Sequence, residues 1–182
     1  MSNDATIEPV VQDGNVVIVI RCEDANERSA VHSVNLEAFG QAEEADLVDR
    51  LHQEGVVLLS LVAVVGTKIA GHILFSRMWI DNANGSIPAV ALAPMAVLPG
   101  HQRQGVGGRL IRSGLDSLRD RGEQIVIVLG YPDYYPRFGF STEKARALES
   151  PFPPCAFMAT ELSLNALGGI CGRVRYPAAF GL

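Results

Sequence analysis

The chain has few cysteines and no pairing pattern among them. Three occur in 182 residues, Cys22, Cys155 and Cys171, and no two form a C-x-x-C pair. An odd and widely spaced set excludes a disulfide framework and offers no zinc-ligand spacing. We therefore expect reduced, buried thiols and no metal site.

Long apolar runs are missing as well. The longest, GVVLLSLVAVVG at residues 55–66, is broken by glycines at about half the length of a membrane span. The first ten residues, MSNDATIEPV, lack the basic patch and apolar stretch of a secretion signal. These absences predict a cytoplasmic protein with no membrane partner.

An excess of positive charge is also absent. The sequence has 15 Lys and Arg against 20 Asp and Glu, which gives a net charge of -5. Because proteins that bind phosphate backbones need a basic face, nucleic acid is not an expected partner. Apolar residues, in contrast, make up 48% of the chain. That share is enough for one domain over residues 1–182 to bury a core.

The first part of the chain predicts one strand and two helices. Residues 15–21 are a β-branched strand, and Asp24 with Glu27 forms a capping box that opens a helix. A second helix over residues 42–54 has acidic residues in its first turn and ends at Gly55. The face of the first helix that we expect to be buried carries Ala30, Val31, Val34 and Ala38.

The middle of the chain changes to β periodicity and then to a β-α-β pattern. Residues 56–97 predict a three-stranded meander with polar turns. A helix over residues 105–121 follows, and residues 124–130 form an apolar strand without alternation, which is typical of a buried parallel strand. The last third is rich in proline and aromatics, with strands expected at residues 156–164 and 172–176. The apolar stripe of the helix comprises Val106, Leu110, Ile111, Leu115 and Leu118.

Glycines cluster where the meander ends and this helix begins. Gly105, Gly107 and Gly108 would let backbone N–H groups approach an anion at the helix N-terminus. A dinucleotide fingerprint fits poorly, because Leu110 takes the place of its last glycine and no acidic residue ends the next strand. The Walker pattern does not occur. Close packing of strand and helix remains the alternative to a phosphate site.

Neighbouring motifs support the phosphate interpretation. Gln102-x-x-Gly105-x-Gly107 follows MAVLP and resembles the acetyl-CoA-binding motif of the GNAT superfamily of N-acyltransferases. The stretches AFGQAEEADLVDRL, VGTKIAGHILFS, VLGYPDYYPRFGF and GRVRYPAAF then occur in an order similar to the YhbS-like branch of that superfamily. The resemblance covers nearly the whole chain.

The resemblance implies an α/β (α+β) fold, a mixed and mostly antiparallel sheet flanked by helices. It also implies that the central strand and the strand at residues 124–130 separate to admit acetyl-CoA, with a backbone N–H near Ala96 facing the oxyanion. Arg103 and Arg109 would add positive charge. The cofactor contacts that it implies are Met95, Ala96 and Val97 for the pantetheine arm, and Gln102, Arg103, Gln104, Gly105, Val106, Gly107 and Gly108 for the pyrophosphate.

Tyr135 is the catalytic residue that the resemblance implies. It stands five residues before Phe140 in YPRFGF, where many superfamily members carry the general acid that protonates departing CoA. Simple packing against the cofactor is the alternative. Tyr134 is expected to be a core or rim aromatic.

No general base can be assigned from the sequence. The central strand AVALAPMAV contains no ionisable residue, although many superfamily members use a Glu there. The candidates are His72, Glu44 and Glu161. Each also has a purely structural alternative: a hydrogen-bonded core histidine for His72, a carboxylate that stabilises the helix dipole for Glu44, and a solvent-facing carboxylate for Glu161. Tyr131 also departs from the usual Asp, which would alter the acceptor pocket.

The expected activity is acetyl transfer from acetyl-CoA to a primary amine by direct attack in a ternary complex, without a metal. A non-catalytic acyl-CoA-binding regulatory module is the main alternative, and an interaction protein that has lost the cofactor is the other. The acceptor, a small molecule or a protein amine, is not encoded in any motif. The C-terminal RYPAAF segment would suit a homodimer contact.

Overall fold

The computed structural model describes residues 17–182. Asn15 and Val16, which open the predicted first strand, lie outside the described residues, as does the segment compared with a secretion signal. Eight strands form one sheet in the order β1-β2-β3-β4-β5-β7, with β8 on β3 and β6 on β8. Their bounds are β1 Ile18–Cys22, β2 Val57–Val65, β3 Lys68–Asn82, β4 Gly85–Val97, β5 Ile125–Leu129, β6 Leu148–Glu149, β7 Phe157–Glu161 and β8 Gly172–Arg175.

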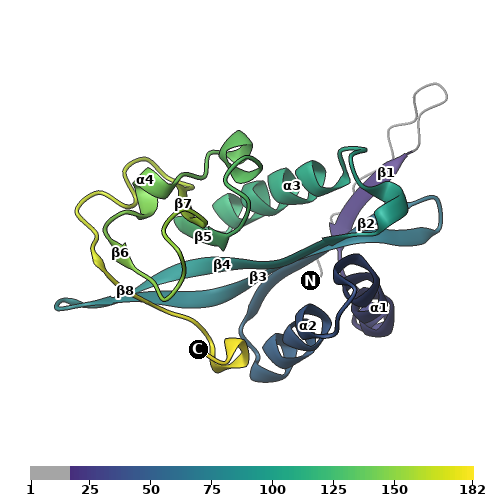
Figure 1. Ribbon diagram of the computed structural model, residues 1–182, viewed down its shortest axis with the longest axis horizontal. Helices are drawn as coiled ribbons and strands as arrows, with labels where there is room; N and C mark the ends of the chain where they lie inside the picture. The colour runs from purple at the N-terminus through teal and green to yellow at the C-terminus, as the bar shows by residue number, and fades with distance from the viewer. Residues whose placement is uncertain (1–16) are drawn as a thin grey trace, which may run out of the picture.

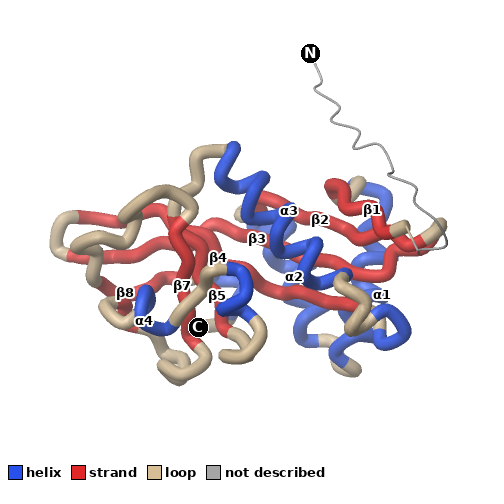
Figure 2. Tube along the Cα trace, turned by 90° about the horizontal axis from the view of Figure 1, so that it is seen from above, coloured by secondary structure: helices blue, strands red, loops and turns tan. Residues whose placement is uncertain are grey.

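The sheet is mixed and mostly antiparallel, as predicted. Within residues 17–182 the parallel pairs are β4 with β5 and β6 with β8. Helix α3 (Val106–Asp120) covers one face, and α1 (Arg28–Phe39) and α2 (Glu43–Glu54) cover the other (Figure 1). Seen from above, α3 lies across the strands (Figure 2). The shorter helical segments are η1 Ala25–Glu27, η2 Pro99–His101, η3 Tyr135–Phe138, α4 Thr142–Ala145 and η4 Ala178–Phe180.

The first helix begins as predicted and buries most of the predicted face, since Val34 is buried and Ala38 is half-buried. The Glu27 carboxylate accepts the Asp24 N–H at 2.9 Å, which is one half of the expected capping box. Val31 is buried, whereas Ala30, expected on the core face, is exposed. The polar Asn35 is fully buried instead. Its amide bonds the Val31 carbonyl of the same helix and His72 on β3, and hydrophobic periodicity does not predict such contacts.

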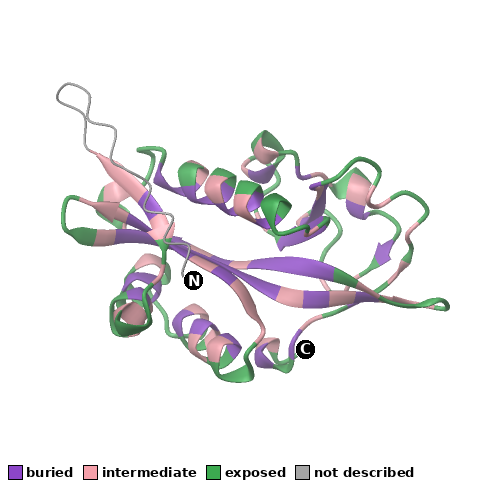
Figure 3. Ribbon diagram, turned by 180° about the vertical axis from the view of Figure 1, so that it is seen from behind, coloured by how far each residue is buried: buried purple, intermediate pink, exposed green. Residues whose placement is uncertain are grey.

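The strands of the meander divide the core between the two faces. Ile73 and Phe75 pack into the cluster under α3, whereas Leu74 between them packs under α1 and α2. The central strands are accordingly buried, while the helices expose their outer faces (Figure 3). All five residues of the predicted α3 stripe are buried. Gly114 on the same helix lets it approach β3, because a Cβ there would lie 2.3 Å from Cε2 of Phe75.

The central strand and β5 separate, as the resemblance implied. Residues 90–92 of β4 pair with residues 126–128 of β5, and the pairing ends there. Strand β4 nevertheless continues to Val97 against β3. One backbone edge of β4 therefore lies open beyond Leu92.

The cysteine prediction was wrong in one respect. Cys22, Cys155 and Cys171 are free, as expected, but all three are exposed. Cys22 is the last residue of β1, and the other two lie in connections between strands, where the chain runs along the surface. Among residues 17–182 no helix is long and apolar enough to cross a membrane.

Candidate active site

A cavity of about 950 Å³ opens where β4 and β5 diverge. Met95 and Tyr135 line it from the cluster under α3, and Phe152 and Phe180 line it from the clusters on the opposite face. The cavity therefore passes between the strands and reaches both faces of the sheet. Its volume is in the range of ligand-binding clefts.

The open edge of β4 presents backbone groups to this cavity. Leu98 donates its N–H to the carbonyl of Ala70 on β3 at 2.9 Å. Because antiparallel hydrogen bonding alternates, Ala96 also faces β3, whereas Met95 and Val97 direct their backbone groups to the open edge. The Val97 carbonyl there accepts a hydrogen bond from Nε2 of Gln102 at 3.0 Å.

The glycine segment forms an uncapped helix N-terminus. Gly105 is the N-cap, with a left-handed φ of 85°, and no side chain caps α3. Its carbonyl accepts the Arg109 N–H at 3.0 Å. The N–H groups of residues 106–108 therefore have no intrahelical acceptor. Arg103 also has a positive φ, 59°, which is rare outside glycine and keeps the preceding turn tight.

Most of the predicted cofactor residues meet at the cavity. Ala96 and Gln104 do not line it: Ala96 faces β3, and Gln104 bonds the Gly100 carbonyl at 2.9 Å. Those that line it are Met95, Val97, Gln102, Arg103, Gly105, Val106, Gly107 and Gly108.

On α3, Arg112 lines the cavity in place of the predicted Arg109. Arg109 reaches toward the Ile18 carbonyl at 3.4 Å, whereas Arg112 lines the cavity with its guanidinium 5.1 Å from the centre of the Phe138 ring. Arg112 stands one helical turn after Gly108 and so shares its side of α3, but this spacing alone does not distinguish it from Arg109.

Tyr135 lies at the end of β5 with its ring buried. A Cβ on Gly130 would lie 2.1 Å from Cε2 of Tyr135, so this glycine makes room for the ring. Burial raises the pKa of Tyr135, first by desolvation and then through the neighbouring tyrosines, which keeps the phenol protonated at neutral pH. Tyr134 packs edge-on at 5.3 Å and places its hydroxyl 2.7 Å from the position of a Cβ on Gly107.

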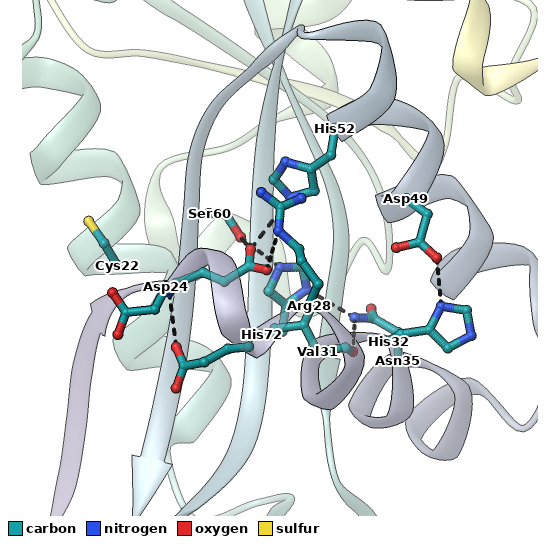
Figure 4. Close-up of polar contacts among 12 residues, drawn as sticks. Cys22, Asp24, Arg28, Val31, His32, Asn35, Asp49, His52, Ser60 and His72 are labelled. Carbon is teal, nitrogen blue, oxygen red and sulfur yellow. Dashed lines mark hydrogen bonds and ion pairs between the residues drawn. The ribbon is translucent and has the colours of Figure 1, made fainter.

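His72 belongs to a buried hydrogen-bond network and not to the cavity. Asn35 donates its amide N–H groups to the Val31 carbonyl at 2.9 Å and to Nδ1 of His72 at 3.0 Å (Figure 4). Since the carbonyl can only accept, it fixes the amide orientation, and Nδ1 of His72 is an acceptor. Nε2 then donates to Ser60 Oγ at 2.9 Å, and Ser60 donates to the Glu23 carboxylate.

This network holds His72 neutral. Burial lowers the pKa of His72 to about 4, against the opposing charge of Glu23. Burial alone would raise the pKa of Glu23, but the nearby His52 ring, the hydrogen bond from Ser60 and the positive charge of Arg28 outweigh it and lower that pKa. His72 does not line the cavity, so it is not placed to take a proton from an amine there.

Of the three base candidates, Glu44 alone lines the cavity. It stands in the first turn of α2, and its carboxylate accepts hydrogen bonds from the Gln41 side chain at 3.3 and 3.1 Å. Glu161 on β7 instead accepts the Leu167 N–H at 2.8 Å and stabilises a loop outside the cavity.

One further cluster has metal-ligand chemistry. Ligand atoms of His32, Asp46 and Asp49 lie within 4.8 Å of one another on α1 and α2. His32 Nδ1 is already 2.8 Å from an Asp49 oxygen, and none of the three lines the cavity.

Known proteins are similar to this chain in both sequence and fold. Residues 19–142 match the acetyltransferase (GNAT) domain family. The chain is 32% identical over 166 residues to the N-acetyltransferase YhbS of Escherichia coli (strain K12), covering 90% of this chain and 98% of that one. It is 45% identical over 119 residues to the N-acetyltransferase YjhQ of the same strain, covering 64% of this chain and 66% of YjhQ.

Two solved structures that hold the cofactor superpose on the chain. The E. coli YhbS complex with CoA matches with a TM-score of 0.86 at 31% identity, covering 95% of this chain and 97% of that one. A GNAT family acetyltransferase from Brucella melitensis in complex with acetyl-CoA matches with a TM-score of 0.76 at 32% identity, covering 90% and 97%. The motifs, the separated strands and these matches agree: the chain belongs to the GNAT family of N-acetyltransferases.

Proposed function

We propose that this protein transfers the acetyl group of acetyl-CoA directly to a primary amine, with both substrates bound in the cavity between β4 and β5. The observation that carries the proposal is the uncapped N-terminus of α3 at the end of the open edge of β4. Related structures hold CoA and acetyl-CoA, which supports the same cofactor here.

The pyrophosphate would bind at the start of α3. The N–H groups of residues 106–108 and the helix dipole favour an anion there. Arg103 and Arg112, which line the same end of the cavity, add positive charge. The pantetheine arm would extend along β4, where Met95 and Val97 offer backbone groups in the manner of an added strand.

The chemistry requires one bond to form and one to break. The neutral amine nitrogen attacks the thioester carbon, and the carbonyl oxygen becomes an oxyanion that an N–H on the open edge of β4 would stabilise. The C–S bond then breaks, the nitrogen gives a proton to solvent in the cavity, and the sulfur takes one from a nearby acid. Holding the two substrates together supplies rate through orientation.

Tyr135 is proposed as the group that protonates the sulfur. Its ring lies against Gly130, where β5 ends and the strands separate, whereas the Tyr134 hydroxyl lies over Gly107 at the pyrophosphate end. A phenol whose pKa is raised by burial is protonated before the reaction, as an acid must be. Solvent can return the proton to Tyr135 through the cavity.

Calorimetric titration with acetyl-CoA, CoA and NADH tests the cofactor assignment. We expect saturable binding of acetyl-CoA and CoA and none of NADH. Absence of acetyl-CoA binding by the folded protein would contradict the proposal, and binding without transfer to any amine would favour a regulatory module.

A matched pair of charge variants tests the position of the site. Gly107→Glu places a carboxylate at the start of α3, and we expect it to abolish acetyl-CoA binding through steric clash and repulsion. Gly100→Glu adds the same charge to the preceding turn, where a Cβ meets open space outside the cavity. Equal affinities of the two variants would show that the phosphates bind elsewhere.

A further inference from the structure

Exposed apolar side chains line part of the cavity, and the part that they form with the aromatic residues of the C-terminal segment is called its aromatic end here. Six large apolar residues among residues 17–182 are exposed, namely Leu36, Phe39, Leu129, Tyr131, Leu164 and Leu182. Phe39, Leu129 and Tyr131 line the cavity, although they come from the end of α1, the end of β5 and the segment after β5. Apolar groups left open at a concave site are typical of a surface that contacts a ligand.

The C-terminal segment completes this end of the cavity with aromatic rings. Tyr176 packs against Phe152 at 5.7 Å and against Phe180 at 4.9 Å between ring centres, and all three line the cavity. The turn that carries Phe180 lies beside α2 (Figure 1). Glu54 accepts the N–H groups of Ala178 and Ala179 at 3.1 and 2.8 Å, so the wall is held in place.

Charge is distributed unevenly between the two ends. The basic lining residues all lie toward the start of α3 or in the η3 turn: His101, Arg103, Arg112 and Arg137. Glu44, at the aromatic end, is the one acidic side chain among the described lining residues. Within residues 17–182 it accepts from Gln41 and forms no ion pair with Lys, Arg or His.

We infer that the acceptor is a monoamine with an apolar, ring-sized body, whose amino group approaches past Glu44 and whose body packs on the wall of Phe39, Leu129, Tyr131, Phe152, Tyr176 and Phe180. The inference rests on the proposed acetyl transfer and assigns its substrate class. One carboxylate matches one ammonium group, and a second ammonium would lose its hydration among the rings without a partner. A carboxylate on the acceptor would be repelled by Glu44. Polyamines and free amino acids are therefore poor acceptors.

A defined amine panel tests the substrate class. The probes are 2-phenylethylamine and tryptamine as aromatic monoamines, putrescine and spermidine as polyamines, and phenylalanine as an aromatic amine with a carboxylate. CoA and the acetylated product are measured by chromatography, because the three exposed cysteines would react with a thiol reagent. We expect kcat/KM for 2-phenylethylamine to exceed the values for putrescine and phenylalanine by at least about tenfold, the discrimination that buried unpaired charge provides.

Two matched pairs of variants test the residues. Glu44→Gln is expected to raise KM for 2-phenylethylamine about fivefold, because it removes a half-exposed ion pair between the carboxylate and the ammonium group of the acceptor. The affinity for acetyl-CoA should stay unchanged. Glu43→Gln removes the neighbouring exposed charge outside the cavity and is expected to leave KM unchanged. Phe39→Ser and Leu36→Ser form the second pair, since both side chains are about 40% exposed on α1 but only Phe39 lines the cavity.

The outcomes separate the two proposals. Faster transfer to spermidine or phenylalanine than to 2-phenylethylamine would overturn the acceptor class and leave acetyl transfer standing. An equal KM in the Glu44 and Glu43 variants would remove Glu44 from acceptor recognition. Acetyl-CoA binding without transfer to any of the five amines would overturn both the acceptor class and the proposed function.

Discussion

Replacing His72 by Gln should remove a large part of the acid sensitivity of folding. The ring is fully buried, and its pKa is lowered to about 4, whereas an unfolded chain would give about 6.5. Because the folded state binds the proton less readily, protonation of the unfolded chain favours unfolding as the pH falls below about 6.5. The loss continues until the pH reaches the folded-state pKa.

The size of the effect follows from the two pKa values. Between pH 7 and pH 5 this one group lowers the free energy of unfolding by about 2 kcal/mol. Glu23 acts in the same direction, because its pKa is also lowered, but its contribution is lost mainly below its ordinary range near 4.5. The window from pH 7 to pH 5 therefore reports chiefly on His72 within this network.

Urea unfolding followed by the fluorescence of Trp79, the single tryptophan, measures this loss at each pH. His72→Gln should be less stable than the original chain at pH 7 but should lose about 2 kcal/mol less on going to pH 5. His101→Gln, which removes a histidine from the cavity lining, should keep the full acid loss. If the original chain and His72→Gln lose the same free energy of unfolding between pH 7 and pH 5, the His72 ring is not held neutral by its burial in this network.

Three further predictions, which use four substitutions, follow from close contacts in the core and at the site. Gly114→Ala should lower the free energy of unfolding in urea by about 1–3 kcal/mol despite the better helix propensity of alanine, because Phe75 has no room to move; an unchanged midpoint would contradict the packing. Gly130→Ala should lower kcat about tenfold or more by displacing the Tyr135 ring, with the acetyl-CoA Kd from calorimetry unchanged; an unchanged kcat would show that the ring position is unimportant. Tyr135→Phe should lower kcat about 100-fold, whereas Tyr134→Phe should act on acetyl-CoA affinity; equal kcat values in the two variants would remove Tyr135 from the proton transfer.

The sequence predicted those parts of the fold that depend on local patterns. The α3 stripe, the meander and the buried β5 strand all carry strong periodicity, and the order of motifs identified the family. Ala30 was wrongly expected to be buried. Asn35 was missed because a polar residue adds nothing to an apolar pattern, and the contact that accompanies its burial is with His72, 37 residues away in the sequence. Arg109 and Arg112 could not be distinguished either, since the direction of a long side chain depends on what lies beside the helix, here Ile18 and Phe138.

The two ends of the cavity also differ in how they are encoded. Backbone groups form much of the proposed cofactor end, and their geometry is set by a short continuous segment whose glycines and positive φ angles leave a local signal. Side chains from α1, α2, the end of β5 and the C-terminal turn line the proposed acceptor end. Tertiary packing alone brings those segments together, so no spacing in the sequence marks them as one surface. If the proposed assignment holds, substitutions at distant positions such as Phe39, Glu44 and Phe180 should change which amine is acetylated and leave the backbone-lined cofactor end intact.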